Sequence, residues 1–189
     1  MNLRGLLQGQ GGYGLLPEGL EDAERAAAAL RGEGVSLVYS SDLQRALETA
    51  AVLRRGLQLR APVRRSRALR EFDYGRFSGR PVNEVQRLCP QFRRDAAFVF
   101  PGGESYVNVQ ARALRWLEGL LKRHRRGAVA VVSHGGWLRS LFAGLRGLPL
   151  NQCLGGNVPH GPVGRLDVHP RSGLRLTVSP AVTIFPESL

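Results

Sequence analysis

The strongest pattern along the chain is a run of five small apolar residues at 128–132, which predicts a strand buried on both faces. Residues 36–40 predict another short buried strand, and 61–66 is a further candidate. Helices are expected over residues 17–31, 42–55, 82–88, 105–125 and 136–145. Pro17 suits the first turn of the first helix, and Ser105 is a good N-cap for the long amphipathic one.

Two last strands, at about 164–168 and 174–179, are expected to form a hairpin around Pro170 and Gly173. Helices and strands alternate along the rest of the chain. This order predicts an α/β fold, a three-layer α/β/α sandwich with a mostly parallel central sheet. Because no internal repeat and no Pro-, Gly- or Ser-rich linker divides the chain, residues 1–189 are expected to form a single domain.

The net charge of +12 is carried almost entirely by arginine, since Lys122 is the only lysine. The arginines are scattered and no aromatic residues are interleaved with them, which disfavours a dedicated nucleic-acid-binding protein. No apolar run approaches the length of a membrane span, and no signal-peptide pattern is present. Cys89 and Cys153 match no metal or redox spacing, so we expect reduced thiols in a cytoplasmic protein without metal or cofactor.

Chemically useful side chains follow the predicted strands. Arg45 lies in the first turn of the helix after strand 36–40, Glu71 in the loop after 61–66, and His134 directly after 128–132. The carboxyl ends of parallel strands meet at one edge of a sheet, where ligands bind and helix N-termini attract anions. We therefore expect these three residues to converge on an anionic ligand.

Arg45 and Glu71 each allow two interpretations. The Arg45 guanidinium can grip two phosphate oxygens, or it can pair with Asp42 or Glu48 along the helix. The Glu71 carboxyl, beside apolar rings, can have a raised pKa and protonate a leaving oxygen, or it can pair with Arg70 or Arg76 on the surface.

His134 is followed by Gly135 and Gly136, which allow a ligand to approach the backbone closely. A histidine there can donate to a phosphoryl oxygen and stabilise charge in the transition state. Alternatively, it is a turn histidine whose ring is satisfied by neighbouring carbonyls. The turn at 101–105 either borders the same site or only caps the following helix.

Three segments together, Tyr39–Ala50, Leu69–Gly79 and Val131–Trp137, resemble the histidine phosphatase superfamily, also called phosphoglycerate-mutase-like. The resemblance extends over nearly the whole chain. It implies a phosphomonoesterase that acts on a small phosphorylated metabolite through a phosphohistidine intermediate. Phosphatase is favoured over mutase because the long insertion typical of glycolytic mutases is missing.

The resemblance also assigns roles. Arg45 and His134 would hold the phosphoryl oxygens, and Glu71 would protonate the leaving group. The residues that would line the phosphate site beside them are Gln8, Gly9 and Gly135. Small phosphorylated compounds or inorganic phosphate are the implied partners. Relatives often form homodimers, but no feature of this sequence decides the oligomeric state.

One departure from the family concerns the nucleophile. In the family it is a histidine in an Arg-His-Gly motif, and none of the four histidines here follows arginine and precedes glycine. We therefore expect the family's first strand and this motif, about 15 residues in all, to lie before Asn2 and to be absent from the fold of this chain. Alternatives are an inactive phosphate-binding protein and, less favoured, a phosphoglycerate mutase or a nucleic-acid-binding protein.

Overall fold

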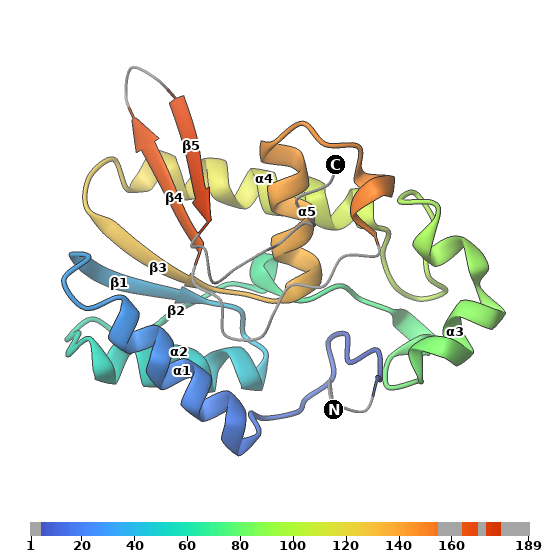
Figure 1. The fold of residues 1–189 in the computed structure, drawn as a ribbon, viewed down its shortest axis with the longest axis horizontal. Coiled ribbons are helices and arrows are strands. Elements are labelled where there is room, and N and C mark those ends of the chain that lie inside the picture. The colour runs from blue at the N-terminus through green and yellow to red at the C-terminus, as the bar shows by residue number, and fades with distance from the viewer. Residues whose placement is uncertain (1–4, 155–163, 170–172, 179–189) are drawn as a thin grey trace.

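The computed structural model describes residues 5–154, 164–169 and 173–178 (Figure 1). The main sheet within these residues has three parallel strands in the order β2-β1-β3: Arg64–Arg65, Val35–Ser40 and Ala128–Val132. The helices are α1 (Pro17–Ala29), α2 (Gln44–Gly56), α3 (Val82–Leu88), α4 (Tyr106–Arg123) and α5 (Gly135–Leu145). Short 3-10 turns cover Arg67–Leu69, Gly75–Phe77, Pro90–Arg93 and Leu150–Cys153.

Alternating side chains of β1 and β3 divide the core into two layers. Val38, Ala130 and Val132 face α1 and α2, where they pack with alanines such as Ala27 and Ala50. The other face of the same strands, which includes Leu37 and Tyr39, packs against α4 and α5. Successive residues of a strand point to opposite faces, so both faces of this sheet need a helical cover. Figure 1 shows that cover, which confirms the predicted three-layer α/β/α fold with a parallel sheet.

Two predicted elements differ in extent. Only Arg64 and Arg65 pair with β1, because Pro62 has no N–H to contribute to a longer ladder. Helix α2 begins at Gln44, two residues after the predicted start. The reason is local: Ser41 Oγ accepts a hydrogen bond from Leu43 N at 3.2 Å, and the Asp42 carboxylate is bound to Arg70.

The predicted C-terminal hairpin is present as β4 (Gly164–His169) and β5 (Gly173–Val178), paired antiparallel. The residues that join them lie outside the described part of the chain, as does the predicted turn residue Pro170. The hairpin forms a second sheet of its own. Among the described strands, β3 is hydrogen-bonded to β1 alone. None of the described helices combines the length and the apolar character needed to cross a bilayer.

Candidate functional site

The carboxyl ends of the three parallel strands meet at one edge of the sheet. Ser41 N donates to Val132 O at 3.0 Å, and Ser66 N donates to Ser40 O at 2.9 Å, so the turns after all three strands lie side by side. From this edge α2 and α5 begin, with Arg45 in the first turn of one and His134 as the N-cap residue of the other.

The structure places the Glu71 carboxylate against the start of α5. Its Oε1 accepts hydrogen bonds from Phe72 N at 2.8 Å and Trp137 N at 3.2 Å, and its Oε2 accepts one from Gly136 N at 3.1 Å. Three backbone donors and the positive end of the helix dipole stabilise the negative charge. The sequence did not predict this placement on backbone donors. Among the described ion pairs none joins Glu71 to Arg70 or Arg76, and Arg70 is paired with Asp42.

Gly136 is required at its position by Glu71 rather than by a ligand. A Cβ built on Gly136 would lie 2.5 Å from Glu71 Oε1, closer than real Cβ contacts come. We expect Gly136→Ala to push the carboxylate off the helix start and to lower the free energy of unfolding by about 1–3 kcal/mol, measured by urea denaturation. The control is Gly119→Ala in α4, where the nearest atom is the flexible end of Arg123; it should cost nothing or stabilise the protein. Equal effects of both changes would contradict the assignment.

The His134 ring is buried at the same edge, and its side chain is only 7% exposed. Its Nε2 has no hydrogen-bond partner, so the alternative of a turn histidine satisfied by carbonyls at this nitrogen is wrong. Burial lowers the pKa of His134 well below its ordinary value of 6.5, and the positive charges of Arg45 and Arg112 lower it further. The ring is therefore neutral near pH 7, and its Nε2 forms no hydrogen bond.

This shift predicts how stability depends on pH. The unfolded chain binds a proton at His134 near pH 6.5, whereas the folded protein resists it. The free energy of unfolding should therefore fall as the pH is lowered below about 6.5, by at most about 1.4 kcal/mol per pH unit from this group, until the folded pKa is passed. Urea denaturation across this range should show a smaller fall for His134→Gln than for wild type. An unchanged slope in the variant would refute the prediction.

Arg45 is held at the site by the N-terminal loop. Its Nη2 donates to Gly9 O at 2.8 Å and its Nη1 donates to Gly11 O at 3.1 Å. Burial lowers the pKa of its guanidinium, and the nearby Glu71 carboxylate acts in the opposite direction. The described ion pairs do not include the alternative of Arg45 with Asp42 or Glu48. Asp42 pairs with Arg70 and Arg67, and the Glu48 carboxylate accepts hydrogen bonds from Leu15 N and Gln44 Nε2.

The structure also places the other residues named from the family resemblance. Gly9 lies beside Arg45, with φ +54, and a Cβ there would lie 2.9 Å from Ser78 Oγ. Gly135 is the first residue of α5. Gln8 contributes its carbonyl, which accepts from Gly11 N at 3.2 Å, while no side-chain bond of Gln8 is found among the described residues.

Gln10, which sequence reasoning missed, is the polar side chain of this loop that contacts the Glu71 segment. Its Nε2 donates to Glu71 O at 3.2 Å, and its Oε1 accepts from Arg70 Nη1 at 3.2 Å. Arg70 in turn makes two hydrogen bonds to Asp42, of 2.6 and 2.7 Å, which raise the pKa of Arg70 and lower that of Asp42. The N-terminal loop, the Glu71 segment and the turn after β1 are thus connected.

Arg112 of α4 is the second residue that sequence reasoning missed. Its Nη1 donates to Ala68 O at 3.0 Å and Arg70 O at 2.7 Å, and its Nη2 donates to Glu71 O at 3.1 Å. The same guanidinium is paired side-on with Glu104, at 2.7 and 3.1 Å. We call this pair the Arg112–Glu104 clamp. It fixes the backbone on which Glu71 is carried.

The turn at 101–105 belongs to this clamp as well as to the helix cap. Glu104 Oε1 accepts from Asp73 N at 2.9 Å, and Ser105 Oγ accepts from Asn108 N at 3.2 Å. Two backbone segments come so close here that a Cβ on Gly103 would lie 2.3 Å from Asp73 O. The turn therefore supports the Glu71 loop from behind.

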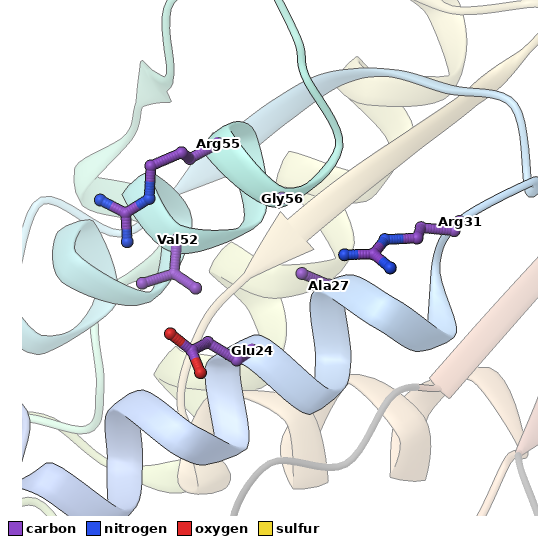
Figure 2. Close-up of a pocket in the computed structure, with 6 residues that line it drawn as sticks. All are labelled: Glu24, Ala27, Arg31, Val52, Arg55 and Gly56. Atoms are coloured by element: carbon purple, nitrogen blue, oxygen red, sulfur yellow. The ribbon is translucent and has the colours of Figure 1, made fainter.

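A hollow of about 270 Å³ lies elsewhere, between α1 and α2. Figure 2 labels residues that line it: Glu24, Ala27, Arg31, Val52, Arg55 and Gly56. None of these residues belongs to the cluster around His134. The hollow is where the two helices approach closely, since a Cβ on Gly56 would lie 2.8 Å from Ala27 Cβ. In the part of the chain that the structure describes, no three His, Cys, Asp or Glu side chains gather closely enough to hold a metal ion.

Comparison with known proteins gives a consistent result. The family model of the histidine phosphatase superfamily (branch 1) matches residues 1–177. The glucosyl-3-phosphoglycerate phosphatase of Mycolicibacterium vanbaalenii is 37% identical over 163 residues, which are 79% of this chain and 72% of that protein. Phosphoserine phosphatase 1 of Hydrogenobacter thermophilus is 34% identical over 143 residues, which are 73% of this chain and 67% of that protein.

Solved structures agree with the sequence matches. The native structure of a mycobacterial glucosyl-3-phosphoglycerate phosphatase superposes with a TM-score of 0.81 at 29% identity, covering 94% of this chain and 92% of that one. By its sequence and its fold, this chain belongs to the histidine phosphatase superfamily.

Proposed function

We propose that this protein is a phosphomonoesterase that acts on a small phosphorylated metabolite through a phosphohistidine intermediate. The observation that carries the proposal is the buried, unpartnered Nε2 of His134, next to Arg45 and Glu71 at the edge where three strands end. A buried nitrogen without a partner costs free energy that a bound phosphoryl oxygen would offset. Arg45 and Arg112, the positive charges that act on His134, supply the charge that such a group needs.

Relatives support the substrate class. Structures of the mycobacterial glucosyl-3-phosphoglycerate phosphatase have been solved in complex with inorganic phosphate and with VO3. The compounds named for the two enzymes compared above are both phosphate esters that also carry a carboxylate. Cytoplasmic residence and a homodimer stay predictions from the sequence, and the chemistry proposed here depends on neither.

In the proposed reaction, the histidine of the family's Arg-His-Gly motif, which none of the four histidines of this sequence represents, attacks phosphorus in line with the leaving oxygen. The five N–H donors of Arg45, two of which are engaged by Gly9 and Gly11, offer further bonds to the equatorial oxygens. His134 donates from Nε2 in the tautomer that carries its proton there, and stabilises the charge that spreads over these oxygens. Water then hydrolyses the phosphohistidine.

Glu71 moves the proton in both steps. It gives a proton to the leaving alcohol in the first step, and accepts one from water in the second. The hydrogen bonds from Phe72, Gly136 and Trp137 stabilise the carboxylate form that the second step requires. They also fix the carboxylate next to the phosphoryl group rather than in open solvent.

The proton-donor role of Glu71 predicts a dependence on the leaving group. In the active enzyme, Glu71→Gln should lower turnover of alkyl phosphates by about 100-fold or more, and that of an aryl phosphate with an acidic phenol much less. The reason is that a good leaving group departs without a proton. Steady-state kinetics on a series of phosphate esters measures this. The same loss for every ester would rule out the donor role.

An inactive phosphate-binding protein is the second candidate, and the lack of an Arg-His-Gly motif in the sequence favours it. The test uses the protein purified from its own source. Its intact mass is measured, and the sample is assayed with phosphoserine and quenched in alkali to detect phosphohistidine. Turnover with a trapped phosphohistidine supports the enzyme. Phosphate binding without either, at the mass of residues 1–189, supports the second candidate.

A further inference from the structure

The N-terminal loop that precedes α1 is held at both ends by side chains of α2. Arg45 donates from Nη2 to Gly9 O at 2.8 Å and from Nη1 to Gly11 O at 3.1 Å. One turn further along α2, Glu48 Oε2 accepts a hydrogen bond from Leu15 N at 2.5 Å. We call the loop from Gly9 to Leu15 the strap. In Figure 1 it is part of the dark blue segment that leads into α1.

The Glu48 carboxylate is committed to this contact. Its Oε1 accepts a hydrogen bond from Gln44 Nε2 at 2.9 Å, which fixes its orientation. A Cβ built on Gly14 would lie 3.0 and 3.1 Å from the two carboxylate oxygens, so the strap passes directly over them. Glu48 is half-buried and forms no ion pair with any residue that the structure describes. Its negative charge therefore serves the backbone of the strap.

Between Gly11 and Leu15 the strap has little to hold it. Gly12, Tyr13 and Gly14 are exposed, and they form no hydrogen bond within the described part of the chain. Glycine has a large choice of backbone conformations, so this stretch gains much freedom when an anchor is lost. The order of the strap therefore depends on the two side chains of α2.

The strap also touches both groups to which the proposed function gives a role. Gln10 Nε2 donates to Glu71 O at 3.2 Å, and Gln10 Oε1 accepts from Arg70 Nη1 at 3.2 Å. Arg45, which holds the other part of the strap, acts on His134 through its charge and is the proposed ligand of the phosphoryl group. A change in the strap is thus a change at the site.

Arg45 takes part in two events at once. A guanidinium has five N–H donors, and the carbonyls of Gly9 and Gly11 use two of them, which leaves three for an anion. These carbonyls also restrict the rotation of the side chain, and a side chain that is already ordered loses less entropy when it binds a ligand. A bound phosphate in turn fixes the guanidinium that holds the strap. Coupling of this kind is reciprocal.

We propose that the strap and the phosphate site are coupled through Arg45, and that Glu48 is a positioning residue that keeps the strap closed. This inference rests on the proposed function, because it takes Arg45 as a ligand of phosphate. Glu48 acts through Leu15 and the carbonyls that orient Arg45, and not on the ligand itself. Phosphate should therefore order the strap, and loss of the Glu48 contact should weaken the binding of phosphate.

The first test is amide hydrogen exchange of the 189-residue protein, followed by NMR with and without saturating inorganic phosphate. We expect exchange of the Leu15 amide to slow by about fivefold or more, the size of a typical coupling between two sites. The control is the Leu57 amide, which donates to Leu53 O at 2.9 Å at the other end of α2 and should change little. Equal slowing of both amides would mean that phosphate stabilises the protein as a whole, and would overturn the coupling.

The second test compares two variants that remove the same charge. Glu48→Ala deletes the acceptor of the Leu15 amide, whereas Glu48→Gln keeps a side-chain oxygen that can accept from it. Calorimetric titration with inorganic phosphate should show binding about fivefold or more weaker in Glu48→Ala, with Glu48→Gln close to wild type. Removal of a negative charge alone would strengthen the binding of an anion, so the expected loss has the opposite sign to a charge effect.

The outcomes distinguish this inference from the proposed function. If wild type binds no phosphate, the proposed function fails. If wild type binds phosphate while exchange at Leu15 is unchanged, or if Glu48→Ala binds it as tightly as Glu48→Gln, the coupling fails and the proposed function stands. If Glu48→Ala does not fold by circular dichroism, the exchange measurement on wild type decides alone.

Discussion

Arg112→Leu should lower the free energy of unfolding by about 3–5 kcal/mol, the cost of removing one partner from a buried ion pair. Both side chains of the Arg112–Glu104 clamp are only 17% exposed. The substitution leaves the Glu104 carboxylate without its cation, and it also leaves the carbonyls of Ala68, Arg70 and Glu71 without this donor. Urea denaturation followed by tryptophan fluorescence measures the loss.

Two further variants separate the clamp from a general effect of losing an arginine. Arg115→Leu changes an exposed residue of the same helix and should alter stability by no more than about 0.5 kcal/mol. Arg112→Lys keeps the charge but not the fork of donors, so it should be intermediate. A cost below about 1 kcal/mol for Arg112→Leu would mean that the clamp does not hold the Glu71 loop in solution.

Arg45→Met should weaken the binding of inorganic phosphate by roughly tenfold to 100-fold, because a hydrogen bond to a charged group contributes about 1.5–3 kcal/mol. Of the charged groups around His134, Arg45 has the largest effect on the pKa of that histidine. Arg45 also donates hydrogen bonds to the carbonyls of Gly9 and Gly11. Calorimetric titration measures the affinity. Arg45→Lys should restore part of it, since a point charge remains without the paired geometry.

Arg55→Met is the control for this experiment. Arg55 is exposed on the same helix and lines the hollow of Figure 2, away from the strand edge. It removes one positive charge from a protein of net charge +12, as Arg45→Met does. If both variants lose the same affinity, phosphate is attracted by the overall charge and not by the site.

Those parts of the fold that depend on local sequence were predictable. The apolar run at 128–132 became β3 without change, and Ser105 caps α4 as its position suggested. The two-residue strand β2 was overestimated, because hydrophobic pattern alone does not show that Pro62 cannot join a ladder. The convergence of Arg45, Glu71 and His134 followed from the parallel order of the strands. This order brings the carboxyl ends of the strands together independently of the conformation of the loops.

What sequence reasoning missed depends on contacts between distant segments. Arg112 lies 41 positions from Glu71, and nothing in the sequence around it distinguishes it from the other arginines of the chain. Gln10 contacts the Glu71 segment across 61 positions. The hydrogen bond from Gly136 N to the Glu71 carboxylate also spans 65 positions. Here the glycine at 136 was a signal that another group approaches the backbone of α5 closely. Patterns of period two or 3.6 report burial, and they carry no information on such partners.

The most direct test of the proposed phosphate site is whether His134 Nε2 donates a hydrogen bond to a phosphate oxygen. Nitrogen NMR of the histidine-labelled 189-residue protein, titrated with inorganic phosphate, reports on each of its four histidines. The account predicts that the His134 Nε2 resonance shifts and saturates, that the other three move little, and that the shift disappears in His134→Gln. A titration in which His134 does not move, or in which all four histidines move together, would contradict it.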